Sequence, residues 1–454
     1  MSSDRDTIFA LSSGRPPAAI AVVRISGPQA GAALTKLIGR LPAPRRATLA
    51  SVRDPASGDV LDESLALWFP APHSETGEDV GELQVHGGRA VIAAVLAVLA
   101  KLPGLRHAEP GEFTRRAFEN GRIDLTAAEA LADLVAAETE AQRRQAFRQL
   151  KGLLGERAEG WRQRLIEALA LVEAGIDFSD EEDVPKDMMA RGLELVRPLA
   201  YEIAQAVIGQ GERLREGLRV AIAGPPNAGK STLFNRLARR DAAIVSPFPG
   251  TTRDVLEVHL DLGGYPVTVL DTAGIRETND PIESEGVRRA SAQAADADLV
   301  LWILDASLLR ELPPSPRPAQ VTADGKLWIL VNKMDLIDLT HQRKIESLFT
   351  PELAVHFISS ATGSGLEDLI ATMSCFVADF FTAEPALVTR ARHRALLEET
   401  AGALRGAEKA AGDGQEEIMA EQLRLATRSL GKLLGRVDVE DVLDVIFRDF
   451  CIGK

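Results

Sequence analysis

The chain has 454 residues, of which 45% are hydrophobic and 26% charged, and its formal net charge at pH 7 is −14. This length exceeds one hydrophobic core and predicts two or three domains, while the acidic balance argues against a broad electrostatic grip on DNA or RNA. The longest apolar stretch is too short to span a membrane, no secretory signal pattern is present, and two cysteines exclude a disulfide framework, so we expect a cytoplasmic protein.

The first hundred residues alternate short apolar runs with turn signals, which is typical of a small α+β domain. Strands are expected over residues 7–11, 18–25, 65–69 and 80–85, with a hairpin-type turn at 57–59 and a helix over 90–102. The segment 111–122, GEFTRRAFENGR, follows these strands and this helix.

Helical periodicity begins beyond that segment. Thr126 and Glu129 form a predicted capping box, and an apolar stripe continues from there through Leu169. The acidic run 177–183 is predicted to be an exposed loop, with a metal site as the second interpretation. Another helical stretch is expected over 188–214.

A second helical region follows Pro385, with helical spacing through residue 434 and again over 439–447. We therefore predict one α-helical domain made from both flanks, with another domain inserted in it. Basic clusters lie at 143–151 and 390–394. They are interpreted either as solvated helix faces or as local RNA contacts.

The inserted domain begins with a phosphate-binding loop. The run 224–231, GPPNAGKS, follows an apolar strand-like stretch at 218–223 and precedes a helix-compatible stretch at 232–239. In such a loop backbone N–H groups face phosphate oxygens, Lys230 reaches the β and γ phosphates, and the Ser231 hydroxyl ligates Mg²⁺. Nucleotide contacts are expected from Asn227, Ala228, Gly229, Lys230, Ser231 and Thr232.

A second motif closes the strand-like stretch 267–270. Its residues are Asp271, Thr272, Ala273 and Gly274. A carboxylate at that strand end can hold Mg²⁺ through water, and the Gly274 N–H can sense the γ phosphate. This motif extends the predicted nucleotide site to a second strand.

Two further strand ends indicate guanine as the base. Asn332, Lys333 and Asp335 follow the strand-like stretch 327–331, and the Asp335 carboxylate offers two acceptors to the N1–H and amino group of guanine. Ser359, Ser360 and Ala361 end the stretch 355–358 and offer a backbone N–H to guanine O6. GTPases usually have Ser-Ala-Lys at these positions, with the lysine packed along the base.

The first switch is expected in the segment 246–254, where a threonine hydroxyl can complete the Mg²⁺ shell. Ile275 occupies the position at which many GTPases carry a glutamine that orients the attacking water. Glu283 and Glu285 are the candidates for that role, or else exposed loop charges. The Asn227 side chain can face a monovalent cation beside the phosphates.

Taken together, the 111–122 segment, the switch sequence at 250–254 and the terminal FCIGK at 450–454 resemble the MnmE (TrmE) family over essentially the whole chain. This family comprises tRNA modification GTPases that act with the flavoprotein MnmG (GidA), expected as a heterotetramer. They form 5-carboxymethylaminomethyluridine or 5-aminomethyluridine at wobble position 34. A tetrahydrofolate derivative, 5-formyl or 5,10-methylene, supplies the carbon unit, and FAD and NADH enter only through the partner.

The resemblance implies specific metal ligands. Ser231 and Thr252 would hold Mg²⁺, and K⁺ would be held by Asn227 and the carbonyls of Ser246, Phe248 and Thr251. The cation site would be completed when two GTPase domains meet in a homodimer, which makes hydrolysis dependent on K⁺ and activated by dimerisation. Glu283 falls at the family's water-orienting glutamate.

The resemblance also implies a folate site in the amino-terminal domain, which carries dimerisation in the family. Its contacting positions correspond to Arg24, Glu82, Arg122 and Lys454. Cys451 is either a nucleophile toward the uridine or a structural thiol. Phe447, Phe450 and Ile452 are predicted packing residues, and Cys375 is predicted to lie in the core of a helix over 366–381.

The predicted architecture is multidomain. It comprises an α+β folate-binding and dimerisation domain over 1–119, an α-helical domain over 120–216 and 382–454, and an inserted α/β Ras-like P-loop GTPase domain over 217–381. The runner-up interpretation is a GTP-switched ribosome-assembly factor that binds RNA, and a third is a GTP-gated scaffold that does not hydrolyse GTP.

Overall fold

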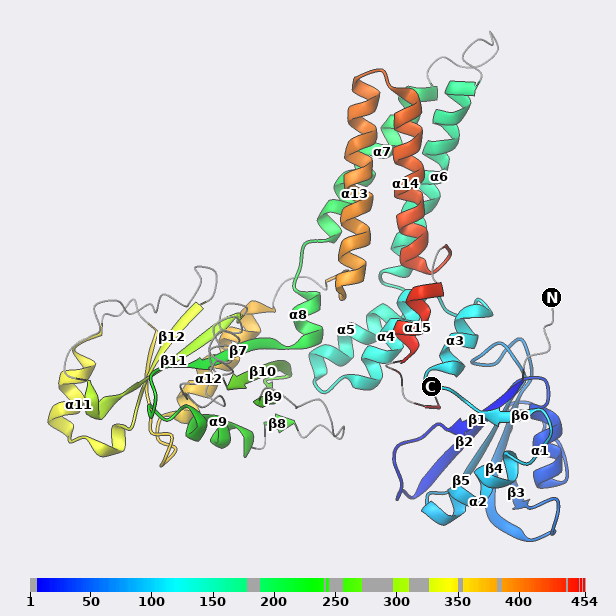
Figure 1. Cartoon of the computed structure of the whole chain (residues 1–454), viewed down its shortest axis with the longest axis horizontal. Helices are drawn as coiled ribbons and strands as arrows, with labels where there is room; N and C mark the ends of the chain where they lie inside the picture. Colours follow the sequence, from blue (N-terminus) through cyan, green and yellow to red (C-terminus); the bar gives the residue numbers. More distant parts are fainter. Residues whose placement is uncertain are drawn as a thin grey trace, which may run out of the picture. The chain divides into compact units, whose positions relative to one another are not determined.

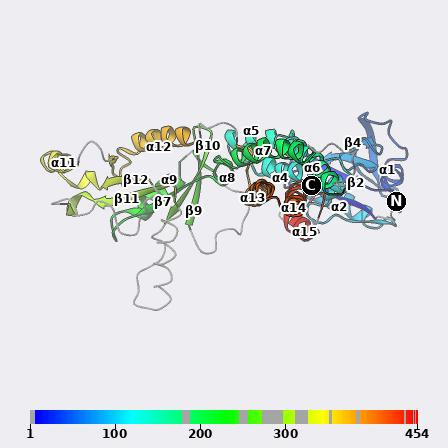
Figure 2. The same cartoon turned by 90° about the horizontal axis from the view of Figure 1, so that it is seen from above.

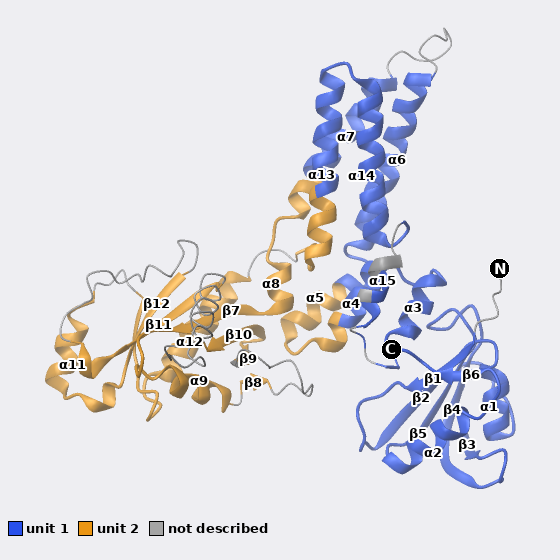
Figure 3. Ribbon diagram, viewed as in Figure 1, with its two compact units in different colours: residues 1–132, 149–201, 399–454 blue, residues 133–148, 202–398 orange. Residues whose placement is uncertain are grey.

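A computed structural model describes residues 6–177, 188–240, 242–244, 256–271, 297–309, 326–349, 354–381, 386–437, 440–448, 450 and 452–453. The chain divides into two compact units (Figure 3). Unit 1 consists of Met1–Ala132, Gln149–Tyr201 and Glu399–Lys454, and unit 2 of Asp133–Arg148 and Glu202–Glu398. The domain borders expected from the sequence stay predictions.

Unit 1 contains a six-stranded sheet in the order β3-β4-β5-β2-β1-β6 (Figure 1). All strands pair antiparallel except β6, which pairs parallel with β1. The four predicted strands are present, and the hairpin turn lies between β3 and β4 as expected. The bounds are β1 Thr7–Leu11, β2 Ile20–Ser26, β3 Thr48–Arg53, β4 Val60–Phe69, β5 Val80–His86 and β6 Leu105–His107.

The two faces of this sheet differ. Helices α1, Ala30–Ile38, and α2, Arg89–Leu99, bury one face in a shared apolar core. On the other face, α3, Glu112–Glu119, covers β1 through Phe113, which packs with Ile8 and Ala10. Exposed leucines extend along β3 and β4 on that second face, which we call the open face.

The helical region begins with α4, Leu125–Ala136, α5, Glu140–Leu150, and α6, Gly155–Asp177. The predicted capping box at Thr126 is wrong, because Asp124 caps α4: its Oδ1 accepts the Ala127 N–H at 2.8 Å and the Thr126 hydroxyl at 2.7 Å. An aspartate is a stronger helix cap than a threonine, and α4 therefore begins at Leu125, two residues before the start that a Thr126 cap predicts.

The long helices form a bundle within unit 1. Buried Trp161 and Leu165 of α6 face α14, Glu416–Leu434, which buries Leu423 and Leu430. The remaining helices are α7, Met188–Ala206, α13, Ala391–Gly412, and α15, Glu440–Arg448. The single helix predicted over 188–214 is wrong, since α7 ends at Ala206 and the short α8, Gly211–Glu216, follows it.

Unit 2 contains a seven-stranded sheet in the order β13-β12-β11-β7-β10-β9-β8. The first five strands in this order, β13 to β10, pair parallel with their neighbours. Strand β9 pairs antiparallel with β10, and β8 pairs antiparallel with β9. The bounds are β7 Leu218–Ala223, β8 Ala243–Ile244, β9 Leu256–Leu262, β10 Tyr265–Asp271, β11 Leu299–Asp305, β12 Lys326–Asn332 and β13 Val355–Phe357.

Helices pack on both faces of this sheet, as a doubly wound fold requires. Figure 2 shows α12 along one side of the strands. On one face α9, Lys230–Ala238, and α12, Leu366–Phe380, share a core with the strands. On the other, Ile345 of α11, Leu339–Glu346, packs near β11 and β12. Short 3₁₀ turns, η1 Ala306–Leu308 and η2 Met334–Leu336, follow those two strands.

Two predicted packing residues are exposed. Cys375 lies on the solvent side of α12, and Ile452 is 61% exposed, although Phe447 and Phe450 are buried as expected. Met373 and Val377 of α12 are buried, and a residue midway between them on a helix faces the opposite side. Within the described ranges, none of the helices combines the length and apolarity needed to cross a membrane.

Candidate functional site

The phosphate-binding loop lies between β7 and α9 in unit 2. Lys230, the first residue of α9, donates from Nζ to the carbonyls of Gly224 at 2.8 Å and Pro225 at 2.9 Å, so its ammonium lies within the curve of the loop. Asn227 is exposed and has a φ of 60°, a left-handed conformation that asparagine tolerates. Ser231 and Thr232 are exposed in the first turn of α9, where a helix attracts anions.

Asn332 connects this loop to the predicted guanine segments. The side chain is buried; its Nδ2 donates to the Ala228 carbonyl at 2.7 Å, and its Oδ1 accepts the Ser360 N–H at 2.8 Å. A Cβ at Gly229 would lie 2.2 Å from Asn332 Nδ2. Glycine is therefore required there both for its φ of 100° and for the close approach of the amide.

The predicted base-binding residues lie together. The hydroxyl of buried Ser359 donates to Asp335 Oδ1 at 2.6 Å, which fixes the exposed carboxylate at the end of β12. Ser360 and Ala361 follow on the same loop. The structure therefore brings Asn332, Asp335 and the 359–361 segment to one edge of the sheet, next to the phosphate-binding loop.

Lys333 has a partner that sequence reasoning missed. Its Nζ donates to Asp305 Oδ2 at 2.6 Å, and Asp305 is the last residue of β11. Burial raises the pKa of the Asp305 carboxyl, but the hydrogen bonds from Lys333 and Ser307 outweigh burial and hold the pKa below its ordinary value. The sequence could have indicated Asp305, because it is a carboxylate at the end of a parallel strand, the same pattern that indicated Asp271.

Arg236 was missed as well. It lies on α9 and donates to two carbonyls of the 359–361 loop, Ser360 at 3.0 Å and Ala361 at 2.7 Å. No sequence motif marks this arginine, because its partners lie 124 and 125 positions away.

Asp271 is buried at the carboxyl end of β10, paired in register with Ile222 of β7, and so lies one strand from the phosphate-binding loop. The other predicted nucleotide, metal and catalytic positions, and the predicted folate position Lys454, lie outside the described residues. These are Ser246, Phe248, Thr251, Thr252, Thr272, Ala273, Gly274, Glu283, Glu285, Cys451 and Lys454.

The predicted folate residues belong to unit 1. Arg24 of β2 and Glu82 of β5 are paired in register, and Glu82 Oε1 accepts from Arg24 Nε at 3.0 Å and Nη2 at 2.9 Å. A further ion pair joins Arg24 to Glu75, and its guanidinium lies 5.8 Å from the centre of the Phe113 ring. Glu75 lies in the loop between β4 and β5. Arg122 contacts this loop too, with its Cγ 3.2 Å from a Cβ built on Gly77.

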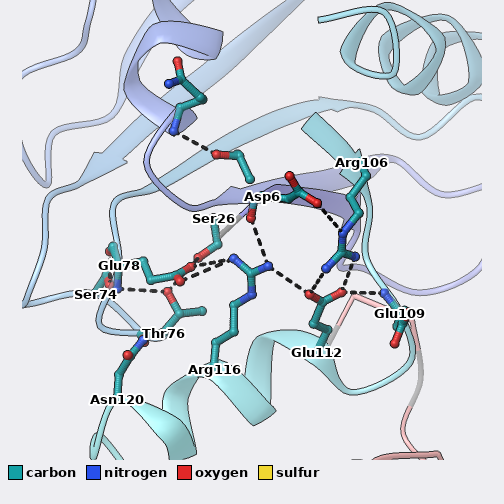
Figure 4. A network of polar contacts seen from close by, with 12 residues as sticks. Asp6, Ser26, Ser74, Thr76, Glu78, Arg106, Glu109, Glu112, Arg116 and Asn120 are labelled. Carbon is teal, nitrogen blue, oxygen red and sulfur yellow. Dashed lines mark hydrogen bonds and ion pairs between the residues drawn. The ribbon is translucent and has the colours of Figure 1, made fainter. Parts of the chain in front are cut away.

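A polar network fixes that loop (Figure 4). Arg116 of α3 is buried and donates to Glu78 at 3.0 Å and to Glu112 at 2.9 Å, and Asn120 donates to the Thr76 carbonyl at 2.7 Å. Burial raises the pKa of the Glu112 carboxyl, yet its hydrogen bonds, above all those from Arg106, lower the pKa below its ordinary value. Glu112 is thus held ionised beside the buried Arg116 guanidinium.

The C-terminal segment packs on this part of unit 1. Ile452 forms an antiparallel bridge with Pro110, and a Cβ on Gly453 would lie 2.1 Å from the Leu11 carbonyl. Leu11 adjoins Ala10, the residue of β1 that is in register with Arg24. A cavity of about 680 Å³ lies between α3 and α15 and is lined by residues of both, including Arg115 and Asp444.

The basic clusters pair largely with the chain's own carboxylates. Arg143 and Arg144 of α5 both bind Glu140, whose pKa falls to about 2 through the hydrogen bonds from those arginines. In unit 2, Arg390 binds Asp133 at 2.6 Å and Arg394 binds Glu212. The exposed pairs on α5 favour the solvated-face interpretation, whereas Arg390 and Arg394 are partly buried in pairs within unit 2.

Family models and relatives match nearly the whole chain. Residues 7–122 match the family described as GTP-binding protein TrmE N-terminus, and residues 125–451 match the MnmE helical domain. The chain is 58% identical to a Bradyrhizobium protein named tRNA modification GTPase MnmE, with 99% of each chain covered. The chain belongs to the MnmE family.

Other MnmE proteins are similarly related. Rhodopseudomonas palustris MnmE is 55% identical with both chains fully covered, and Rhodospirillum rubrum MnmE is 53% identical with 99% of each covered. As an MnmE-family tRNA modification GTPase, the chain is a GTP hydrolase. Its fold combines the TrmE amino-terminal domain, the MnmE helical domain and a P-loop GTPase domain.

Proposed function

We propose that the chain is a K⁺-dependent GTPase, activated by dimerisation, that acts with the flavoprotein MnmG in folate-dependent modification of the wobble uridine of tRNA in the cytoplasm. The observation that carries the nucleotide part is the convergence of Lys230, Asn332 and Asp335 at one sheet edge. Family membership supports tRNA as the substrate. The same membership disfavours the ribosome-assembly interpretation.

In this proposal the chain's residues bind and orient GTP. Asp335 and the 359–361 loop select guanine, Lys230 neutralises charge on the β and γ phosphates, and Glu283 orients the attacking water. Ser231 and Thr252 hold Mg²⁺, with Asp271 and Thr272 through Gly274 next to it. Bound metal ions supply positive charge for the transition state.

The proposed K⁺ ligands are Asn227 and the carbonyls of Ser246, Phe248 and Thr251. The exposure and left-handed backbone of Asn227 support this assignment, because they place an amide oxygen at the outer surface of the loop. An exposed cation site at this place can be completed by a second GTPase domain. K⁺ would then take the role that an arginine plays in other GTPases.

We expect GTP turnover to be at least tenfold faster in KCl than in NaCl of equal ionic strength. Asn227→Ala should abolish that difference, because it removes one cation ligand and leaves the backbone amides that bind phosphate. Steady-state phosphate release in matched buffers measures both effects. The K⁺ rate per molecule should also rise with protein concentration, as dimerisation requires.

The control is Thr232→Ser, which keeps a hydroxyl at an exposed position in the first turn of α9. It should retain the difference between K⁺ and Na⁺. Equal turnover in the two salts by the unmodified protein would refute the K⁺ assignment, and a rate independent of protein concentration would refute activation by dimerisation.

The open face of the amino-terminal sheet supports the dimer and folate parts of the proposal. Leu49 and Leu65 are paired in register there and are 66% and 41% exposed, a pattern that favours coverage by another protein surface. Arg24 and Glu82 lie on the same face, near the loop that Arg122 contacts. Lys454 would approach it from the C-terminal segment.

We expect Glu82→Gln to weaken binding of 5-formyltetrahydrofolate by roughly tenfold or more. Both Arg24 contacts use Oε1, so the proposal assigns Oε2 to the N–H donors of the pterin, and an amide loses the charge that strengthens such bonds. Isothermal titration calorimetry measures the affinity. Glu63→Gln, an exposed glutamate of β4 on the same face, should bind folate normally; equal losses in both variants would refute this site.

A further inference from the structure

The base-binding loop lacks the lysine that GTPases usually place beside guanine, since Ala361 occupies that position. A cationic side chain nevertheless reaches the loop from another element. Arg236 of α9 donates from Nη1 to the carbonyls of Ser360 and Ala361, and its Cζ lies 3.2 Å from a Cβ built on Gly363. The guanidinium thus lies directly against the loop backbone.

The Ser360 carbonyl and the Ala361 N–H belong to one peptide unit. A trans peptide is planar, and its C=O and N–H point in opposite directions. When Arg236 holds the Ser360 carbonyl at 3.0 Å, the Ala361 N–H must point away from the guanidinium. A hydrogen bond to the carbonyl also polarises the peptide and strengthens its N–H as a donor.

The neighbouring amide is already engaged. The Ser360 N–H donates to Asn332 Oδ1 at 2.8 Å, so it cannot bind the base without giving up a buried hydrogen bond. The Thr362 N–H donates to the Ser359 hydroxyl at 3.1 Å. Of these three successive amides, Ala361 is the one left to recognise guanine O6.

We propose that Arg236 is a positioning residue for guanine recognition, which orients the Ser360–Ala361 peptide so that the Ala361 N–H donates to guanine O6. The proposal rests on the guanine site assigned above. It adds a residue to that site, the Arg236 guanidinium, which comes from the helix that begins at the phosphate-binding loop. Asn332 and Arg236 then hold the two sides of Ser360, and both link it to the phosphate-binding region.

The test compares three nucleotides bound to the full-length protein by equilibrium titration. GDP presents both O6 and the edge facing Asp335, 6-thio-GDP weakens only the acceptor at position 6, and IDP lacks only the 2-amino group. Arg236→Met removes the donors and keeps an apolar chain of similar length. We expect this variant to bind GDP and IDP more weakly than the unmodified protein by the same factor, roughly tenfold. Its affinity for 6-thio-GDP should fall by about threefold or less.

The preference for GDP over 6-thio-GDP should therefore narrow in the variant. A merely structural arginine would weaken all three nucleotides equally, and that result would overturn the proposal, as would unchanged GDP affinity. Arg239→Ala, an exposed arginine at the end of the same helix, is the matched control and should bind like the unmodified protein. If Arg236→Met does not fold, Arg236→Leu, which also lacks a donor, replaces it under the same criteria.

The variant Asp335→Asn separates a failure of the guanine-site assignment from a failure of the role proposed for Arg236. An asparagine at that position accepts from N1–H and donates to a 2-oxo group, so GDP affinity should fall and xanthosine diphosphate affinity should rise. If Asp335→Asn leaves GDP affinity unchanged, the guanine assignment is wrong and the role of Arg236 falls with it. If Asp335→Asn switches the base and Arg236→Met leaves the GDP to 6-thio-GDP ratio intact, only the role of Arg236 is overturned.

Discussion

Replacing Lys230 by alanine is expected to lower the kcat for GTP hydrolysis by about 10²–10³-fold, the cost of removing one preorganised charge from a phosphoryl-transfer site. The ammonium is held by the Gly224 and Pro225 carbonyls within the phosphate-binding loop, at the first residue of α9. Single-turnover hydrolysis with enzyme in excess measures the chemical step separately from product release.

Lys344→Ala is the matched control for this experiment. Lys344 is an exposed lysine of α11 in the same unit, so its removal changes the net charge equally without touching the loop. Its kcat should stay within a factor of two of the unmodified protein, as expected for a surface substitution. A Lys230→Ala enzyme that kept more than a tenth of the single-turnover rate would contradict the role assigned to this lysine.

Gly229→Ala is expected to weaken GTP and GDP binding by roughly a hundredfold. Its backbone has a φ of 100°, which costs an L-residue about 1–2 kcal/mol, and the new methyl would lie 2.2 Å from Asn332 Nδ2. Asn332 would have to move, and its hydrogen bonds to Ala228 and Ser360 would break together. Equilibrium titration with a fluorescent GDP analogue measures the loss.

Gly263 provides a control that separates backbone strain from crowding. It also has a positive φ, 65°, but a Cβ there would have open space around it. Gly263→Ala should therefore cost some thermal stability and leave nucleotide affinity unchanged. If both variants lost affinity equally, displacement of Asn332 would not be the cause.

Local sequence pattern was sufficient to predict the strands that position the nucleotide site. The stretch 218–223 coincides with β7, because a continuous apolar run before a glycine-rich turn has few other solutions. The helix after it begins at Lys230, two residues earlier than predicted, since the loop itself supplies the first helical turn. The predictions were weaker where side chains of similar type compete, as Asp124 and Thr126 do for the start of α4.

Contacts between distant segments could not be predicted from the pattern. The motifs indicated that Asn332 and Ser360 belong to the site, but not that one amide side chain binds both Ala228 and Ser360. Arg236 looked like an ordinary charged residue of an amphipathic helix. Cys375 is exposed because it lies on the side of α12 opposite to the buried Met373 and Val377, a difference in helix face that its apolar character did not indicate.

The bridge between Ile452 and Pro110 has a consequence for how the protein is made. Unit 1 contains both Met1–Ala132 and Glu399–Lys454, whereas Glu202–Glu398 of unit 2 is one continuous segment. Ribosomes add about 5–20 residues per second, so this intervening segment takes on the order of tens of seconds to emerge. The contact between the amino-terminal part of unit 1 and the C-terminal segment therefore forms last, while most of the GTPase sheet can fold earlier, during translation.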